Sequence, residues 1–154
     1  MLVANYYPRC PNPDVALGLE PHSDQGLLTL LLHNEVSGLQ IQHERKWVNV
    51  NAFPNSVLVN IGDLLEVYSN GKYKSVLHRA VVNNQKTRIS IAMFNGPSLE
   101  TIVCPAPQLL QTQGCETAYV PMKYKDFLFS QQNDHRTGKA MLKHIQKSEE
   151  KFTL

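Results

Sequence analysis

Short apolar and β-branched runs recur along the first two thirds of the chain, and turn-forming residues separate them. The runs cover residues 2–7, 15–20, 26–33, 39–43, 47–50, 57–61, 73–82, 88–94 and 101–103. Turn residues stand between them, for example at Ser37-Gly38, Asn70-Gly71 and Asn83-Asn84. Strands that recur about every 8–12 residues with such punctuation are typical of a β-sandwich or barrel. The sequence therefore predicts a mainly β fold.

Helical spacing of apolar residues is found mainly near the C-terminus. It covers residues 123–132 and 139–147, where Met141, Leu142 and Ile145 share one face. The run at 64–68 is too short to distinguish a strand from a single helical turn.

The chain divides into two parts by these patterns. We expect residues 1–104 to form the β core and residues 105–154 to form a crossover loop followed by a helical segment. With 154 residues the chain has the length of one ordinary domain. It opens directly on a predicted strand, which suggests that it is the tail of a longer protein.

Composition and charge exclude several classes of protein. Hydrophobic residues make up 42% and charged residues 18%, values that exclude a disordered chain and a coiled coil. The net charge is +2 with no basic cluster, so we expect no nucleic-acid partner. No apolar run approaches the roughly 18–20 residues of a membrane span. Three cysteines without a C-x-x-C pair favour a reduced, cytoplasmic setting, and we expect a monomer.

His22 and Asp24 form the first candidate metal site. If both lie on one strand, positions i and i+2 project to the same face, so an imidazole and a carboxylate can converge on one cation. His78 lies within an otherwise apolar run, and burying an unpaired imidazole is costly. Two histidines and a carboxylate are the ligand set of non-heme Fe(II) oxygenases. The spacing alone leaves an equal alternative, a hydrogen-bonded core histidine at position 78.

Arg88 and Ser90 form a second polar pair at i and i+2. A guanidinium offers a carboxylate two parallel charge-assisted bonds, and a buried guanidinium without an anion is costly. The short loop at 83–87 indicates that this strand neighbours the His78 strand. Asn5 and Tyr7 form a similar same-face pair on the first strand. These residues predict a carboxylate-binding site near the metal.

Seven motifs together resemble the plant 2-oxoglutarate- and Fe(II)-dependent dioxygenases, which include flavonoid-, gibberellin- and alkaloid-modifying enzymes. They are NYYPRCP at 5–11, PHSD at 21–24, GLQ at 38–40, KWV at 46–48, VNIGD at 59–63, SNGKYKSVLHR at 69–79 and RIS at 88–90. The resemblance runs in order from residue 5 to about residue 97.

The resemblance implies a double-stranded β-helix, or jelly roll, with C-terminal helices. It implies that Fe(II) is held by His22, Asp24 and His78. It also implies that 2-oxoglutarate is bound by Arg88 and Ser90, with Tyr7 and Asn5 reaching it from the first strand, and it leaves ascorbate as a possible accessory. Phe94 is the candidate for the substrate pocket, with plain core packing as an equal alternative.

The implied activity is hydroxylation or desaturation of a small specialised metabolite or hormone, with dioxygen consumed and succinate and carbon dioxide released. The main alternative is a truncated, non-catalytic jelly-roll domain that keeps the fold and, in one version, the metal. A third interpretation, a cupin-like metal-binding module without 2-oxoglutarate, does not explain Arg88 and Ser90. We expect Asp63 to serve a local turn rather than the metal.

Overall fold

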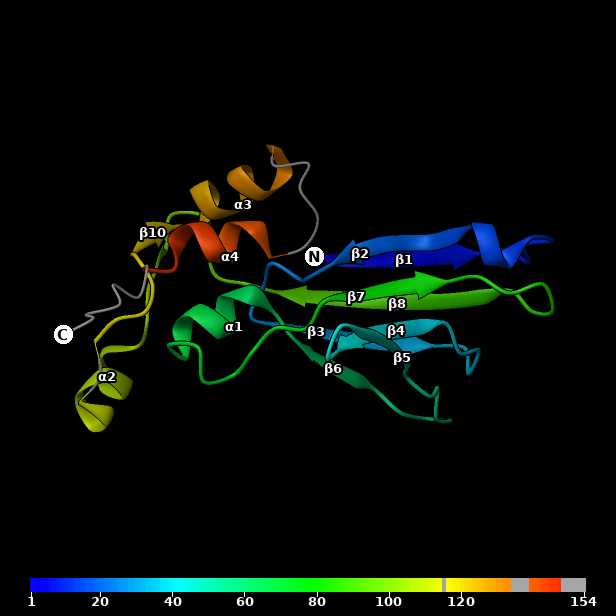
Figure 1. Cartoon of the computed structure of the whole chain (residues 1–154), viewed down its shortest axis with the longest axis horizontal. Helices are drawn as coiled ribbons and strands as arrows, with labels where there is room; N and C mark the ends of the chain where they lie inside the picture. Colours follow the sequence, from blue (N-terminus) through cyan, green and yellow to red (C-terminus); the bar gives the residue numbers. More distant parts are fainter. Residues whose placement is uncertain (115, 134–138, 148–154) are drawn as a thin grey trace.

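Two four-stranded antiparallel sheets form the centre of the computed structural model, which describes residues 1–114, 116–133 and 139–147. The strand orders are β1-β8-β3-β6 and β2-β7-β4-β5. The bounds are β1 Leu2–Tyr7, β2 Leu17–His22, β3 Leu28–His33, β4 Leu39–His43, β5 Lys46–Asn49, β6 Leu58–Ile61, β7 His78–Val81 and β8 Arg88–Asn95. The strands extend toward one end of the molecule and the helices gather at the other (Figure 1). The predicted jelly-roll class is confirmed.

Alternation along β8 shows how the sequence separates the interior of the sandwich from its outer surface. Arg88, Ser90 and Ala92 are buried, whereas the intervening Ile89 and Ile91 are exposed. Successive side chains of a strand point to opposite faces, so the polar residues of β8 point inward and its isoleucines outward. Two buried polar side chains on one inward face indicate a functional interior rather than a purely apolar core.

Three segments differ from the prediction. The ambiguous run at 64–68 belongs to helix α1, Asp63–Tyr68, and the expected long strand at 73–82 is reduced to β7. The backbone N–H of Ser75 donates to the Glu66 carboxylate instead of to a neighbouring strand. The expected irregular crossover contains helix α2, Pro107–Gln113. Proline favours the first turn of a helix, and Gly114 ends α2 with a φ of 58°.

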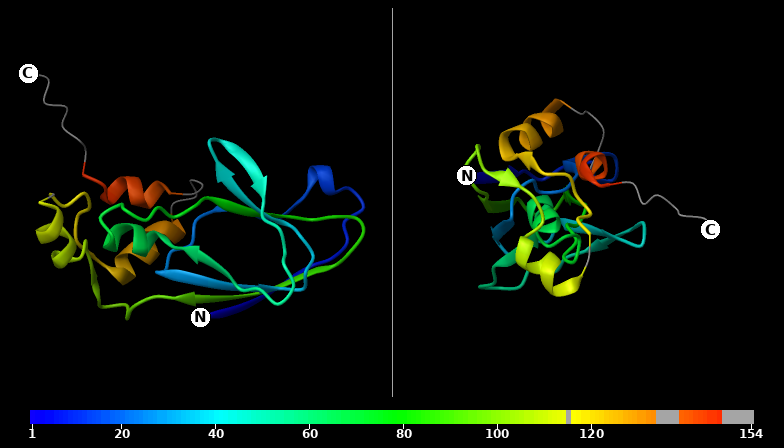
Figure 2. Two further views of the ribbon diagram at one scale, coloured as in Figure 1. Left: turned by 90° about the horizontal axis from the view of Figure 1, so that it is seen from below. Right: turned by 90° about the vertical axis from the view of Figure 1, so that its left-hand side faces the viewer.

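The main hydrophobic core lies at the helical end of the molecule (Figure 2). Helices α3, Tyr124–Asn133, and α4, Ala140–Ile145, confirm the two predicted helical segments. Between β8 and these helices, β9 Ile102–Val103 and β10 Met122–Lys123 form a two-stranded ribbon, and a 3-10 turn, Pro13–Val15, precedes β2. The core consists of Leu64, Val67, Val103, Tyr119, Tyr124, Phe127, Leu142 and Ile145.

This core joins α1 to the C-terminal segment, so the β-sandwich is closed at this end by apolar packing. In the described ranges we find no helix with the length and apolar character needed to cross a membrane. The division of the chain at residue 104 stays a prediction.

Candidate metal centre and ligand cavity

His22 and His78 lie opposite each other on two paired strands. Strands β2 and β7 pair antiparallel, with His22 in register with His78, and the two ring centroids are 4.3 Å apart. The strands that carry the two histidines are therefore direct neighbours. Asp24, however, lies beyond the end of β2, in the loop that follows it, so the expected strand spacing of His22 and Asp24 is wrong. The chain turns after His22 and brings the carboxylate back toward both imidazoles.

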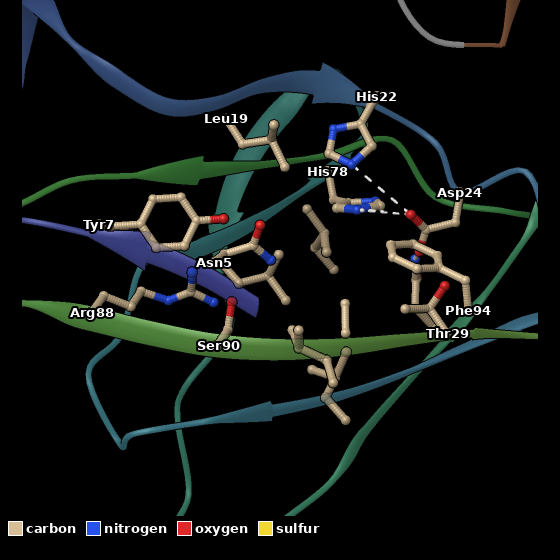
Figure 3. A pocket seen from close by; sticks show the side chains of 16 residues that line it. Asn5, Tyr7, Leu19, His22, Asp24, Thr29, His78, Arg88, Ser90 and Phe94 are labelled. Atoms are coloured by element: carbon tan, nitrogen blue, oxygen red, sulfur yellow. Dashed lines mark hydrogen bonds and ion pairs between the residues drawn. The ribbon is translucent and has the colours of Figure 1, made fainter. Parts of the chain in front are cut away.

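The three side chains converge on one point at the end of the interior (Figure 3). Asp24 Oδ1 lies 3.6 Å from His78 Nε2 and 3.9 Å from His22 Nε2. One nitrogen or oxygen atom from each residue lies within 4.8 Å of the others, an arrangement that can hold a metal ion. The imidazole nitrogens and the carboxylate oxygen are thus ordinary ligands of divalent transition metals.

The other ring nitrogen of each histidine is held by the backbone. His22 Nδ1 lies 2.7 Å from the carbonyl oxygen of Glu20, and His78 Nδ1 lies 3.1 Å from that of Val76. A carbonyl oxygen only accepts, so Nδ1 carries the proton in each ring and Nε2 keeps its lone pair. Such contacts fix the tautomer and orientation that a metal requires of a histidine.

Burial favours the neutral form of His78. The His78 side chain is only 11% exposed, against 34% for His22. Loss of solvation lowers the pKa of His78 below its usual value, and the nearby His22 acts in the same direction, although the Asp24 carboxylate opposes the shift. A neutral imidazole is the form that binds metals.

Asp24 is oriented by groups outside the histidine pair. Asn60 on β6 donates its side-chain N–H to Asp24 Oδ2 at 2.6 Å. The backbone N–H of Asp63 donates to the backbone oxygen of Asp24 at 2.7 Å. With Oδ2 occupied by Asn60, Oδ1 is the oxygen that faces the histidines. The donor set, its tautomers and its supporting contacts fit a divalent metal such as Fe(II).

Asp63 has a larger role than the turn expected from sequence. Its side chain is fully buried, and its carboxylate accepts hydrogen bonds from the hydroxyls of Ser23, at 2.9 Å, and Ser75. It therefore ties the loop that carries Asp24 to the segment that leads into His78. The expected local turn does not account for these two contacts, because both serines are distant from Asp63 in sequence and no local pattern marks them.

A ligand cavity extends from the metal centre along the interior. Strand β1 pairs with β8 so that Asn5 lies opposite Ser90 and Tyr7 opposite Arg88. All four side chains line the cavity, together with His22, Asp24, His78 and Phe94. The predicted residues are thus brought into one space (Figure 3). One expectation is wrong: β7 and β8 lie in different sheets, so the loop at 83–87 crosses between sheets and Arg88 approaches from the opposite wall.

The end of the cavity away from the metal is built for an anion. Arg88 is 4% exposed, and its Nε is buried without a hydrogen-bond partner. Its guanidinium carbon lies 5.0 Å from the centre of the Tyr7 ring. A buried guanidinium with an unused donor is costly unless a ligand pairs with it. A carboxylate is the partner that matches the fork geometry of arginine.

The cavity therefore presents a metal-binding end and an anion-binding end to one ligand. The side chains of Leu31, Leu39, Ile41 and Leu58 add an apolar lining to the same cavity. A short dicarboxylate could pair one carboxylate with Arg88 and direct its other end to the metal. The remaining histidines play no part in the described metal group: His43 and His144 are exposed and His33 is half-buried, while His135 falls outside the described residues.

Known proteins resemble the chain in sequence. A family model described as the 2OG-Fe(II) oxygenase superfamily matches residues 1–97. DMR6-LIKE OXYGENASE 2 from Arabidopsis thaliana is 47% identical over 130 residues, which are 84% of this chain and 36% of that protein. A leucoanthocyanidin dioxygenase from Malus domestica is 54% identical over 105 residues, 68% of this chain and 29% of that enzyme.

Solved structures agree with this assignment. The structure of JOX2 in complex with 2OG, Fe and JA superposes with a TM-score of 0.87 at 38% sequence identity, covering 96% of this chain and 44% of JOX2. The chain thus spans less than half the length of each of these three proteins. On the family match, the plant relatives and the shared fold, the chain belongs to the 2OG-Fe(II) oxygenase superfamily.

Proposed function

We propose that this chain carries the catalytic centre of a 2-oxoglutarate-dependent oxygenase that hydroxylates or desaturates a small specialised metabolite or hormone. His22, Asp24 and His78 would hold Fe(II), and Arg88 with Ser90 would bind the distal carboxylate of 2-oxoglutarate. The observation that carries the proposal is the pairing of a convergent histidine–aspartate–histidine group with a buried, unpartnered Arg88 Nε in one cavity.

Bound Fe(II) would supply the activation of dioxygen, coupled to decarboxylation of 2-oxoglutarate to succinate and carbon dioxide. The chain's own residues supply the geometry. Arg88 and Ser90 fix one end of the cosubstrate, so its keto-acid end is directed toward Asp24 and the histidines. Tyr7 and Asn5 line the same end from β1 and limit the positions that the carbon chain can take.

Phe94 is the proposed contact to the organic substrate. It lies at the metal end of the cavity and is half-buried, so part of its ring is free to contact a ligand. An aromatic face offers apolar area to an uncharged aromatic or cyclic substrate. The leucoanthocyanidin dioxygenases, flavonol synthases and thebaine 6-O-demethylase among its relatives act on molecules of small-metabolite size, as their names state.

We also propose a monomeric, cytoplasmic protein with a small-molecule substrate and no nucleic-acid partner. The near-balanced net charge of +2 supports the last point. Of the cysteines in the described ranges, Cys10 and Cys104 are both free thiols, which fits a reducing compartment. Ascorbate remains a candidate accessory reductant, to be tested by adding it to the assay.

The second candidate, a non-catalytic domain that keeps the fold, is favoured by one observation. Large apolar side chains on the outer face of the β1-β8-β3-β6 sheet are exposed, among them Tyr6 at 69% and Val59 at 56%. Exposed apolar surface of this kind marks interaction sites, which a non-catalytic binding domain would use.

Anaerobic titration separates the two candidates. Adding Fe(II) and then 2-oxoglutarate to the chain should produce the visible charge-transfer band of a chelated complex, and succinate should form when oxygen and a suitable substrate are admitted. The variant Arg88→Gln should weaken 2-oxoglutarate binding by about one to two orders of magnitude and leave Fe(II) binding unchanged. No band at saturating 2-oxoglutarate would overturn the cosubstrate assignment. A band without succinate, across flavonoid, terpenoid and alkaloid substrates, would favour the non-catalytic domain.

A further inference from the structure

Thr29 is a buried hydroxyl residue without a hydrogen-bond partner among the residues that the structure describes. It lies on the central strand β3, in register with Asn60 on β6 and Phe94 on β8, and it lines the cavity. Thr29 is 4% exposed, and its Oγ1 has no hydrogen-bond partner. Among the side chains that the structure describes, only Thr29 Oγ1 and Arg88 Nε are buried polar atoms without a partner. Both belong to the same cavity.

Burying the Thr29 hydroxyl without a hydrogen-bond partner lowers the stability of the folded protein. Buried hydroxyls in proteins are nearly always hydrogen-bonded, because a lost partner is not replaced by water. Valine has almost the same shape as threonine and suits a buried strand position at least as well. A threonine on this inward face is therefore explained if a ligand supplies the partner that the protein lacks.

The position of Thr29 indicates which part of a ligand it meets. Thr29 is paired with Phe94, and Ser90 stands four residues earlier on β8. At the usual rise of a strand, Thr29 and Ser90 are therefore about 13 Å apart along the strand direction. Figure 3 shows Thr29 beside Phe94 and Asp24, at the end opposite Arg88. A five-carbon dicarboxylate with one hydrogen bond at each end has about this span.

We propose that the Thr29 hydroxyl binds 2-oxoglutarate by donating a hydrogen bond to an oxygen atom of its keto-acid end. The inference rests on the proposed function, because it takes Arg88 and Ser90 as the anchor of the opposite carboxylate. Thr29 Oγ1 and Arg88 Nε, the two unpartnered atoms, then bind opposite ends of one 2-oxoglutarate molecule. Thr29 is a binding residue in this scheme, separate from the three side chains that hold the metal.

Two variants and two measurements test the role of Thr29. Thr29→Val removes the hydroxyl and keeps the shape, whereas Thr29→Ser keeps the hydroxyl. The dissociation constant of 2-oxoglutarate is measured anaerobically from the visible band of the Fe(II) protein, and the melting temperature is measured on protein free of metal and 2-oxoglutarate. For Thr29→Val we expect the dissociation constant to rise about tenfold, Fe(II) binding to stay unchanged and the ligand-free protein to melt higher. Thr29→Ser should bind 2-oxoglutarate within about threefold of the parent protein.

Several results would overturn the inference. Thr29→Val could bind 2-oxoglutarate as tightly as the parent protein, or bind it normally and weaken only an organic substrate. A lower melting temperature of ligand-free Thr29→Val would mean that the hydroxyl already has a partner within the protein. The parent protein and Arg88→Gln separate this failure from failure of the proposed function. If the parent binds 2-oxoglutarate and Arg88→Gln binds it more weakly, an unchanged Thr29→Val refutes the Thr29 contact alone.

Discussion

At the scale of single residues, the two carboxylate oxygens of Asp24 have different surroundings. Oδ2 accepts a hydrogen bond from Asn60, while Oδ1 faces the two imidazoles. A carboxylate with both oxygens free could rotate and offer either one to a metal. Asn60 therefore determines that Asp24 presents Oδ1 to a metal. Residues around a metal site commonly orient the ligands in this way without binding the ion themselves.

Replacing Asn60 should weaken metal binding without removing a ligand. We expect Asn60→Leu, which has a similar size but no amide, to lower Fe(II) affinity roughly 10–100-fold. The affinity is measured by anaerobic titration with a competing chelator. Gln40→Ala is the matched control, because the Gln40 amide donates to Asn49 at 2.8 Å, away from the metal group. Equal affinity in Asn60→Leu and the parent would show that Asp24 needs no such support.

His78 should give the metal-free protein a specific pH dependence. Its pKa is lowered in the folded protein, mainly by burial, from about 6.5 in an unfolded chain. The unfolded state then binds the proton more readily, so the stability that neutral His78 provides is present above about pH 6.5 and is lost as the pH falls. His78→Gln removes this dependence. Between about pH 7.5 and 5.5, urea unfolding should show a larger loss of free energy for the parent than for His78→Gln. Parallel losses would contradict the shift.

At the scale of the elements, periodicity and turn residues predict most strands of the two large sheets and the side of β8 that faces inward, although the expected strand at 73–82 is reduced to β7. They could not predict the position of Asp24 beyond β2, because the end of a strand depends on its partner. They also could not reveal that β7 and β8 belong to different sheets, since a short loop is typical of a hairpin as well. The sequence does not indicate the long-range contacts of Asp63 or the importance of Thr29 for a related reason: both depend on buried contacts, or missing contacts, with residues distant in sequence.

Gly38 shows how a connecting element makes room for the cavity. It stands just before β4, and a Cβ added to it would lie 2.8 Å from Cδ of Arg88 and 2.9 Å from the backbone oxygen of Val81. The Arg88 side chain thus lies against Gly38, where any larger residue would collide with it. We infer that Gly38 helps to set the direction of the guanidinium.

The variant Gly38→Ala should therefore affect both stability and cosubstrate binding. We expect a loss of about 1–3 kcal/mol in the free energy of unfolding, because the neighbouring backbone must shift, together with weaker 2-oxoglutarate binding. Urea unfolding and the anaerobic 2-oxoglutarate titration measure the two effects. Ser37→Ala, at the exposed neighbouring position, should change neither. If Gly38→Ala lost stability but bound 2-oxoglutarate normally, Gly38 would not direct Arg88.

At the scale of the whole molecule, the outer face of the β1-β8-β3-β6 sheet carries a continuous apolar surface. Leu2 pairs with Met93, Tyr6 with Ile89, and Leu32 with Ile91. The exposed members of this face are Leu2, Tyr6, Leu32, Val59, Ile89, Ile91 and Met93. Because these side chains alternate with the cavity residues of the same strands, one sheet has a polar functional interior and an apolar exterior.

This outer face should bind apolar probes and limit the solubility of the chain. The double variant Ile89→Thr with Ile91→Thr makes the centre of the face polar and keeps residues that favour strands. We expect weaker fluorescence of an apolar dye and a higher protein concentration at the onset of light scattering. Fe(II) and 2-oxoglutarate binding should stay unchanged, because both positions point away from Ser90 and the cavity. Unchanged dye binding would show that this face is not the apolar surface in solution, whereas lost 2-oxoglutarate binding would show that the two sides of the sheet are not independent.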